Sequence, residues 1–131
     1  MDEKSIKWSQ LNPRDCIQVT QQVWLTQREL QFVTQLYVPF LGVQASTLYL
    51  VLFSELSPNS YQSDVIQLAD LLALLNMGIP DFYQARIRLE SVGLLKTYRY
   101  EDEESISAQY TFELQAPASP NLFFKDALLS T

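Results

Sequence analysis

Hydrophobic and polar residues alternate near the start of the chain. Over residues 17–23, Ile17, Val19 and Val23 would share one side of an extended chain, and Gln21 is the polar residue that interrupts them. A period of two is typical of a half-buried β-strand. The pattern therefore predicts a strand over residues 17–23, with an apolar side that a core or a partner must cover.

Two helices are expected after this strand. Thr26 and Glu29 have the T-x-x-E spacing of a capping box, in which each side chain accepts a hydrogen bond from a backbone N–H of the first turn. Pro39 is predicted to end or kink the first helix, and Gly42 to close the turn that follows. The second helix is expected over residues 43–56. Apolar residues surround it, which is typical of a helix buried on all sides, either in one domain or under a second copy.

The second half of the chain predicts a helix-turn-helix followed by a hairpin. Helices are expected over residues 65–75 and 80–92, joined by a tight turn that contains a glycine. Two strands are expected over 95–100 and 108–114, and a last short helix over 121–129. This order predicts an α+β winged helix, whose wing is the hairpin, with an extra N-terminal strand and a C-terminal helix.

Length and composition are those of one globular domain. The chain has 131 residues, of which 47% are hydrophobic and 18% are charged. We expect residues 1–16 to be a flexible N-terminal arm and residues 17–131 to form the domain. The N-terminus is charged and lacks a following apolar segment, which argues against a signal peptide. The single cysteine, Cys16, fits a reducing compartment and therefore predicts a cytoplasmic protein.

Catalysis is disfavoured by the residues that the sequence lacks. It contains no histidine, which removes the commonest general base and the commonest nitrogen ligand of zinc. The acidic run at residues 101–104 lacks the ligand spacing and the glycine of a calcium loop. We therefore expect a protein without catalytic residues, metal or cofactor, which works by binding other macromolecules.

A helix that binds in the major groove of DNA presents basic and amide side chains outward. With 100° per residue, the outward side of the helix over 80–92 is centred on Ile87. An apolar residue at this position suits a contact with protein better than a contact with DNA. The residues predicted to face inward are Phe82, Ala85, Leu89 and Val92. The residues of the predicted protein-contact face are Tyr83, Gln84, Ile87 and Ser91.

The distribution of charge favours a protein contact but leaves a weak DNA contact open. The net charge is −6, and four consecutive acids at residues 101–104 occupy the wing loop, where phosphates would lie. Against this, a group of cations lies in the last two turns of the fourth helix and the first strand of the hairpin. Such cations are more often solvated and paired with nearby acidic side chains than bound to phosphates. The candidates for a weak DNA contact are Arg86, Arg88, Lys96 and Arg99.

The strand over residues 17–23 is the best candidate for self-association. An open strand edge is a template for pairing with another chain, and the second helix would contribute its outer side. The alternative is an edge strand that pairs within its own chain. The predicted self-association residues are Ile17, Val19, Gln21, Val23, Trp24 and Leu50.

Four segments together resemble a known family. They are T-Q-L-Y-V-P-F-L-G at residues 34–42, A-x-x-L-Y at 45–49, R-L-E-S-V-G-L-L at 88–95 with T-Y at 97–98, and Y-x-F-x-L-x-x-P at 110–117 with S-P-x-x-F-F-x-D-x-L-L at 119–129. In this order and spacing they resemble the N-terminal domain of the DnaB/DnaD family of replication-initiation proteins from Gram-positive bacteria. The resemblance is closer to the DnaB branch of the family, the helicase-loading and membrane-attachment proteins.

This resemblance implies a winged-helix domain that drives oligomerisation, as a homodimer or homotetramer, within a longer protein. It implies partners among the primosome proteins, namely a DnaD-type initiator, an ATPase loader and the replicative helicase. DNA would be contacted mainly by later domains. The full protein would act in the cytoplasm at the replication origin, with peripheral membrane association, and the family domain has no catalytic residues. The alternative is a winged-helix transcription regulator that binds duplex DNA itself.

Overall fold

Helices and strands follow the predicted order through most of the chain. The computed structural model describes residues 11–22, 24–56, 60–101 and 108–117. The elements in these ranges are β1 (Cys16–Gln21), α1 (Gln27–Phe32), η2 (Val33–Tyr37), α2 (Val38–Glu55), β2 (Ile66–Gln67), α3 (Leu68–Leu75), α4 (Ile79–Ser91), β3 (Leu95–Glu101) and β4 (Ala108–Leu114). The predicted helix-turn-helix (α3 and α4) and hairpin (β3 and β4) are confirmed. The helix predicted over 121–129 lies outside the described residues.

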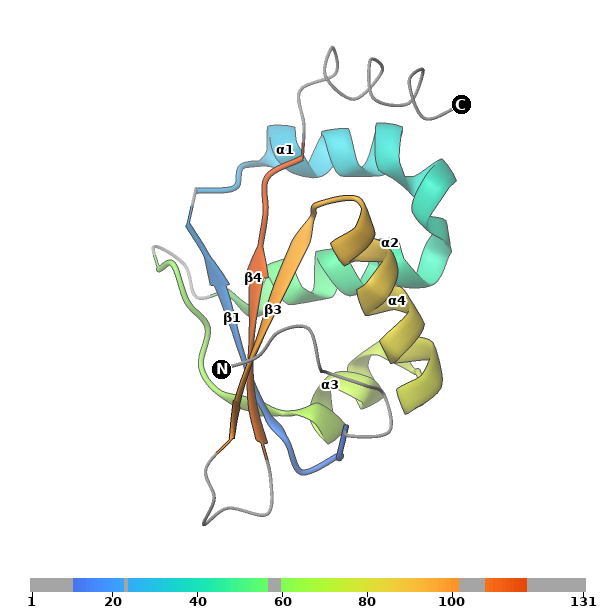
Figure 1. Cartoon of the computed structure of the whole chain (residues 1–131). Coiled ribbons are helices and arrows are strands. Elements are labelled where there is room, and N and C mark those ends of the chain that lie inside the picture. Colours follow the sequence, from blue (N-terminus) through green and yellow to red (C-terminus); the bar gives the residue numbers. More distant parts are fainter. Residues whose placement is uncertain (1–10, 23, 57–59, 102–107, 118–131) are drawn as a thin grey trace.

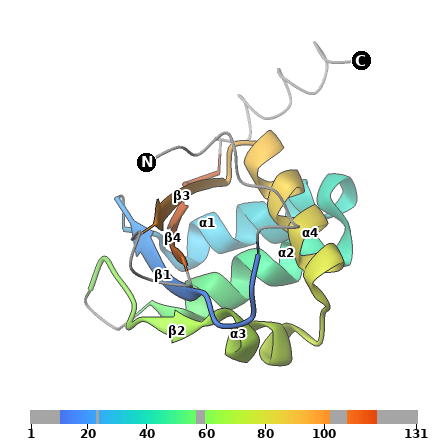
Figure 2. The ribbon, with the colours of Figure 1, turned by 60° about the horizontal axis from the view of Figure 1, so that its bottom comes forward.

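The strands form one mixed sheet in the order β2-β1-β4-β3. β3 and β4 pair antiparallel along their whole length, and β1 runs parallel to β4 along its whole length. On its other side β1 pairs with the short strand β2. β1 is therefore an interior strand of the sheet, and the helices α1, α2 and α4 lie on one side of it (Figures 1 and 2).

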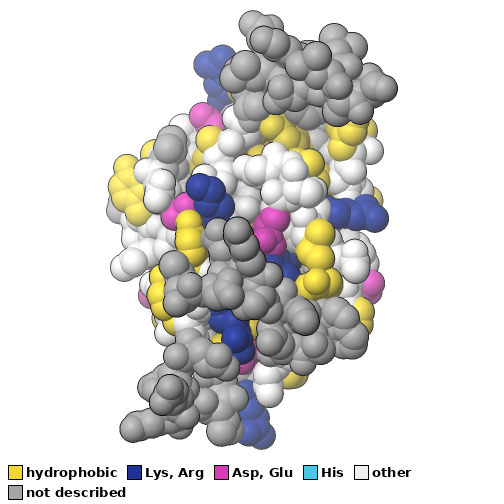
Figure 3. Space-filling model, viewed as in Figure 1, with side chains coloured by type: hydrophobic (Ala, Val, Ile, Leu, Met, Phe, Trp, Pro, Cys, Tyr) yellow, Lys and Arg dark blue, Asp and Glu magenta, His cyan; other side chains and the backbone are white. Residues whose placement is uncertain are grey.

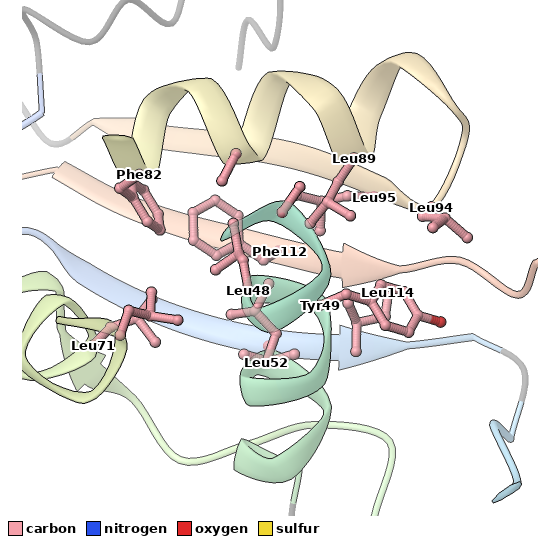
Figure 4. Close-up of a cluster of buried hydrophobic side chains, with 14 of the residues drawn as sticks. Leu48, Tyr49, Leu52, Leu71, Phe82, Leu89, Leu94, Leu95, Phe112 and Leu114 are labelled. Carbon is pink, nitrogen blue, oxygen red and sulfur yellow. The ribbon is translucent and has the colours of Figure 1, made fainter. Parts of the chain in front are cut away.

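Alternation along the strands turns one face of the sheet into the core. Ile17 and Val19 of β1 are fully buried, as the period of two predicts, and the register places them beside Tyr110 and Phe112 of β4. Side chains of α2 and α4 pack against this face (Figure 4). The main helical contributors are Leu48, Tyr49, Leu52, Phe82 and Leu89. The other face of the sheet carries the polar members of the alternation.

The long apolar segment after β1 is helical but broken. The capping box is confirmed, because the Thr26 N–H donates to Glu29 Oε2 at 2.9 Å. The helical path ends at Gly42, whose φ of 81° and ψ of 171° are not helical, and the rest of α2 turns back behind the sheet in Figure 1. The π-helical η2 was not predicted. Gln27–Glu55 is long and apolar enough to cross a membrane, but the break and its packing against the sheet are typical of core helices.

α3 begins later than the sequence predicted. Ile66 and Gln67 were expected in the helix, but they pair with the first two residues of β1 and keep the chain extended until Leu68. Pairing with a neighbouring strand here outweighs the helical pattern of the leucines. α3 ends at Leu75 and is capped by Asn76, whose φ of 53° lies in the left-handed region and starts the tight turn to α4.

Residues 11–16 belong to the domain and not to the predicted flexible arm, and Cys16 is the first residue of β1. Leu11 lies in the core, and Asp15 is only 1% exposed. Asp15 Oδ1 accepts a hydrogen bond from the Ala108 N–H, and Oδ2 accepts one from the Asn12 N–H, both at 2.9 Å. The turn sequence N-P-R-D was the signal available for this attachment. The rest of the predicted arm, residues 1–10, lies outside the described residues.

Candidate functional site

α4 is the helix that a winged helix would place in a DNA groove, and the charged residues on its exposed side are Asp81 and Arg88. The buried residues of α4 are Phe82, Ala85, Arg86 and Leu89. Val92, predicted to face inward, follows the end of α4 and is 39% exposed. Tyr83 of the predicted protein-contact face is half-buried. The exposed members of that face are Gln84, Ile87 and Ser91.

Arg86 was predicted as a weak DNA contact, but its side chain is buried and the residue is 3% exposed. Its Nη1 donates to Glu90 Oε1 at 2.5 Å, and its Cζ lies 5.0 Å from the ring centroid of Tyr83. The Nε has no hydrogen-bond partner among the described residues. The prediction fails for Arg86 because a carboxylate one turn later and an aromatic ring one turn earlier hold the cation inside the domain.

Arg88 is exposed, but its guanidinium is engaged at the break in α2. Nη1 donates at 3.1 Å to the carbonyl of Leu41, the last residue before the break. A Cβ on Gly42 would lie 3.3 Å from this Nη1. A shallow pocket of about 180 Å³ opens beside it, lined in part by Val43 and Gln84. Arg88 therefore connects α4 to the part of α2 that precedes Gly42. This hydrogen bond leaves fewer N–H donors of the Arg88 guanidinium for a ligand.

Lys96 and Arg99 point to opposite faces of β3, since they are three residues apart in a strand. Lys96 is exposed on the outer face, opposite Glu113 of β4. Arg99 is half-buried: its Nε donates to the Tyr110 hydroxyl at 3.2 Å, and its Cζ lies 5.9 Å from the centroid of that ring. The four predicted DNA contacts thus do not form one track, and the Lys and Arg side chains visible in Figure 3 lie apart. Residues 102–104 of the wing loop lie outside the described residues.

β1, predicted as an open edge for self-association, is paired on both sides. β4 occupies one edge, while β2 and a bridge between Thr20 and Gln62 occupy the other. Ile17 and Val19 are fully buried and Gln21 is 5% exposed, so a second copy cannot reach them in the folded domain. The predicted apolar side is real, but helices of the same chain cover it. Val23, also in that prediction, lies outside the described residues.

Two predicted self-association residues remain at the surface, Trp24 at 41% exposed and Leu50 at 39%. Trp24 packs edge to face against Tyr61, with 5.1 Å between the ring centroids and 80° between the ring planes. Tyr61 is itself 53% exposed. It was not predicted, because a tyrosine in a loop has no periodic signal and its neighbour is far away in the sequence.

Gln21 joins the two segments that carry this aromatic pair. Its Oε1 accepts a hydrogen bond from the Leu25 N–H at 3.1 Å, and its Nε2 donates to the Ser60 carbonyl at 3.4 Å. Its backbone N–H donates to the Tyr61 carbonyl at 2.9 Å. The polar residue that interrupts the apolar side of β1 is therefore a buried connector between the end of β1 and the loop before β2.

The titratable side chains of the described residues do not suggest catalysis. No group of three or more Cys, Asp or Glu side chains in this part of the chain could hold a metal ion. Burial raises the pKa of Tyr49, whose hydroxyl donates to the Gln115 carbonyl at 3.0 Å, and it also raises the pKa of Tyr110. Both hydroxyls therefore stay protonated near neutral pH, and both contribute to packing between helices and sheet.

Comparison with known proteins gives the same picture as the fold. Residues 11–131 match the family model of the DnaB N-terminal winged helix domain. The replicative helicase loading/DNA remodeling protein DnaB of Staphylococcus aureus (strain NCTC 8325 / PS 47) is 30% identical over 120 residues, which are 92% of this chain and 25% of that protein. The crystal structure of primosome protein DnaB (residues 1–300) from Geobacillus stearothermophilus matches with a TM-score of 0.81 and 33% identity, over 92% of this chain and 44% of that one.

The chain thus spans about a quarter of the curated relative and less than half of the solved chain. The resemblance inferred from the sequence motifs is confirmed, as is the winged-helix fold. The match includes the helix-turn-helix, the hairpin and the segment from residue 11 that packs onto the domain. This chain belongs to the family of DnaB N-terminal winged helix domains.

Proposed function

We propose that this chain is a non-catalytic self-association and protein-interaction domain of a bacterial replicative helicase loader, which acts in the cytoplasm at the replication origin. Its relatives are named as a helicase loading protein and a primosome protein. The observation that carries the proposal is the exposed side of α4, where Gln84, Ile87 and Ser91 lie, while Arg86 is buried and the exposed Arg88 donates to a carbonyl of the same chain. A surface with an apolar centre and its cations engaged within the domain suits a protein partner better than a phosphate backbone.

The partners follow from this role. A second copy of the domain would bring several loaders together, and α4 would contact other primosome proteins, among which a DnaD-type initiator, an ATPase loader and the replicative helicase are expected. DNA would be contacted mainly by other parts of the full-length protein. The net charge of −6 supports this division of labour, because an acidic domain is repelled by DNA.

The solution mass of the chain and its affinity for duplex DNA test the proposal together. We expect light scattering to show a mass that rises with concentration, and a mobility-shift titration to show little binding of duplex DNA near physiological salt. A transcription regulator with several phosphate contacts would instead bind, and its affinity would fall steeply as salt rises. Lys96→Gln is the matched variant. If Lys96 contacts a phosphate, this change lowers the salt slope by about one; in the proposed role it changes nothing.

A monomer that binds duplex DNA tightly at physiological salt would overturn the proposal in favour of the regulator. A concentration-dependent mass without DNA binding is the result that the proposal requires.

A further inference from the structure

The break in α2 leaves a small pocket between α2 and α4. Its volume is about 180 Å³, and it is lined by Gly42, the three residues that follow, and Gln84, Ala85 and Arg88 of α4. Ala45 and Ala85 are its buried residues. Pockets that hold cofactors and other small molecules usually measure about 300–1,000 Å³. The pocket of this chain therefore suits a single side chain or a small ion better than a cofactor.

Arg88 gives this pocket a positive charge that no acidic side chain of the described residues neutralises. Its Nη1 donates to the carbonyl of Leu41, which is polar but carries no net charge. The ion pair in the described part of the chain joins Arg86 to Glu90 and does not include Arg88. A guanidinium has several N–H donors, so the others remain for a ligand. The bond to Leu41 also fixes the guanidinium before a ligand arrives, which lowers the entropic cost of binding.

The remaining polar side chains of the pocket favour an anionic group. They are the amides of Gln44 and Gln84, which are both exposed. Among the residues that line the pocket there is no Asp or Glu. Amide and guanidinium N–H groups donate to the oxygens of a carboxylate or a phosphate, and hydrogen bonds between charged groups are the stronger kind. The pocket is therefore complementary to one of these two anions.

The residues around the pocket decide between the two. Val43 in its wall is 77% exposed, and Ile87, next to Arg88 on α4, is 37% exposed. A phosphate backbone is bound by several cations along a surface, whereas Arg88 is the one cation among the residues that line this pocket. The exposed Asp81, two turns earlier on the same side of α4, would repel neighbouring phosphates. A carboxylate with apolar neighbours matches both the charge and the apolar surroundings.

We propose that this pocket binds an acidic side chain of a partner protein, an Asp or Glu with apolar neighbours in its own chain. The carboxylate accepts hydrogen bonds from Arg88 and from the amides of Gln44 and Gln84. The apolar neighbours cover Val43 and Ile87. The proposal deepens the protein contact proposed for α4 and rests on it, and it adds the chemistry that the partner must carry at this point.

Titration with a capped tripeptide, followed in proton–nitrogen NMR correlation spectra, tests the pocket. The probe is acetyl-Leu-Glu-Leu-amide, and its control is acetyl-Leu-Gln-Leu-amide, which has nearly the same shape without the charge. The Glu peptide should shift the side-chain N–H signals of Arg88, Gln44 and Gln84. We expect a dissociation constant of about 1 mM for the Glu peptide and binding roughly tenfold weaker or less for the Gln peptide.

Gln84→Glu blocks the pocket and leaves Arg88 at the break. The new carboxylate lies one turn before Arg88, where a pair with the guanidinium stabilises the helix. It should raise the dissociation constant of the Glu peptide roughly tenfold or more, because it engages the donors of Arg88 and repels the ligand. Gln109→Glu is the control, since it makes the same change at an exposed position of β4 and should leave the constant unchanged. Circular dichroism of both variants checks the fold.

The outcomes separate the pocket from the proposed function. If the Glu peptide causes no shift, binds no better than the Gln peptide or binds Gln84→Glu as it binds the parent, the pocket proposal is wrong. The proposed function then stands, because the solution mass and the DNA titration test it independently. Shifts of the same signals on raising the chain concentration without peptide would assign the pocket to a second copy and overturn the partner. Tight binding of a duplex oligonucleotide through these signals at physiological salt would overturn both proposals.

Discussion

Asp15 is a buried carboxylate whose two oxygens both accept hydrogen bonds from backbone amides. One amide belongs to Asn12 in the preceding turn and the other to Ala108 at the start of β4. The carbonyl of Asp15 in addition accepts a hydrogen bond from the N–H of Leu68, the first residue of α3, at 2.7 Å. At the scale of single residues, Asp15 thus connects the N-terminal segment, the wing and the helix-turn-helix.

Replacing Asp15 tests how much this connection stabilises the domain. Asp15→Ala leaves two amides without their charged acceptor, and removal of such a partner costs about 2–3 kcal/mol of unfolding free energy. Urea denaturation followed by circular dichroism measures the loss. Asp64→Ala is the control, because Asp64 is exposed and its loss should change the stability by less than about 0.5 kcal/mol. Equal stability of Asp15→Ala and the parent would contradict the interpretation.

The break at Gly42 is the feature of the helices that most shapes the domain. Its φ of 81° and ψ of 171° belong to a region that only glycine adopts readily. The break lets α2 turn back into the core, and Arg88 of α4 stabilises it by a hydrogen bond to the Leu41 carbonyl. The geometry of one element, α2, therefore depends on a side chain of another, α4.

Gly42→Ala is expected to destabilise the domain by about 1–3 kcal/mol through backbone strain, and further because the new Cβ meets Arg88. Gly93→Ala is the matched control, since Gly93 also has a positive φ, 79°, but no atom lies within 4 Å of an added Cβ. In an Arg88→Ala background the cost of Gly42→Ala should fall towards that of Gly93→Ala. Chemical denaturation of the four variants measures these differences, and strict additivity of Gly42→Ala and Arg88→Ala would argue against the contact.

For the molecule as a whole, stability rests on the packing of α2 and α4 against the sheet, and two buried tyrosines contribute hydrogen bonds to it. The Tyr49 hydroxyl of α2 donates to the Gln115 carbonyl just after β4, and within the sheet Arg99 of β3 donates to the Tyr110 hydroxyl of β4. Burial raises the pKa of both tyrosines above the ordinary value of 10.0. The folded state therefore keeps two neutral phenols where the unfolded chain would ionise.

This arrangement predicts alkaline unfolding with a definite sign. Below pH 10 both states carry neutral phenols and the contribution of Tyr49 is complete. Above that pH the unfolded chain loses the proton first, so stability should fall by about 1.4 kcal/mol per pH unit through Tyr49, and the raised pKa of Tyr110 acts in the same direction. Urea denaturation at several pH values measures the slope. Tyr49→Phe should make the slope shallower above pH 10, whereas Tyr100→Phe, which removes an exposed hydroxyl, should leave it unchanged.

The sequence by itself determined the features that depend on neighbours within a few residues. The capping box at Thr26 and Glu29, the break at Gly42 and the buried stripe of α4 follow from local hydrogen bonding, backbone freedom and helical periodicity. The hairpin follows from a period of two. The family resemblance rests on the same short segments. For this reason the fold class and the family could be predicted from the sequence alone.

Only the tertiary structure decided which surfaces are free. A period of two shows that β1 has an apolar side, but not whether helices of the same chain or a second copy cover it. The sequence around Arg86 does not show that a carboxylate and an aromatic ring enclose its guanidinium. In the same way, the sequence around Trp24 does not show that Tyr61 packs against it. These outcomes depend on residues brought together by packing, because burial is a property of the assembled layers and not of any single segment.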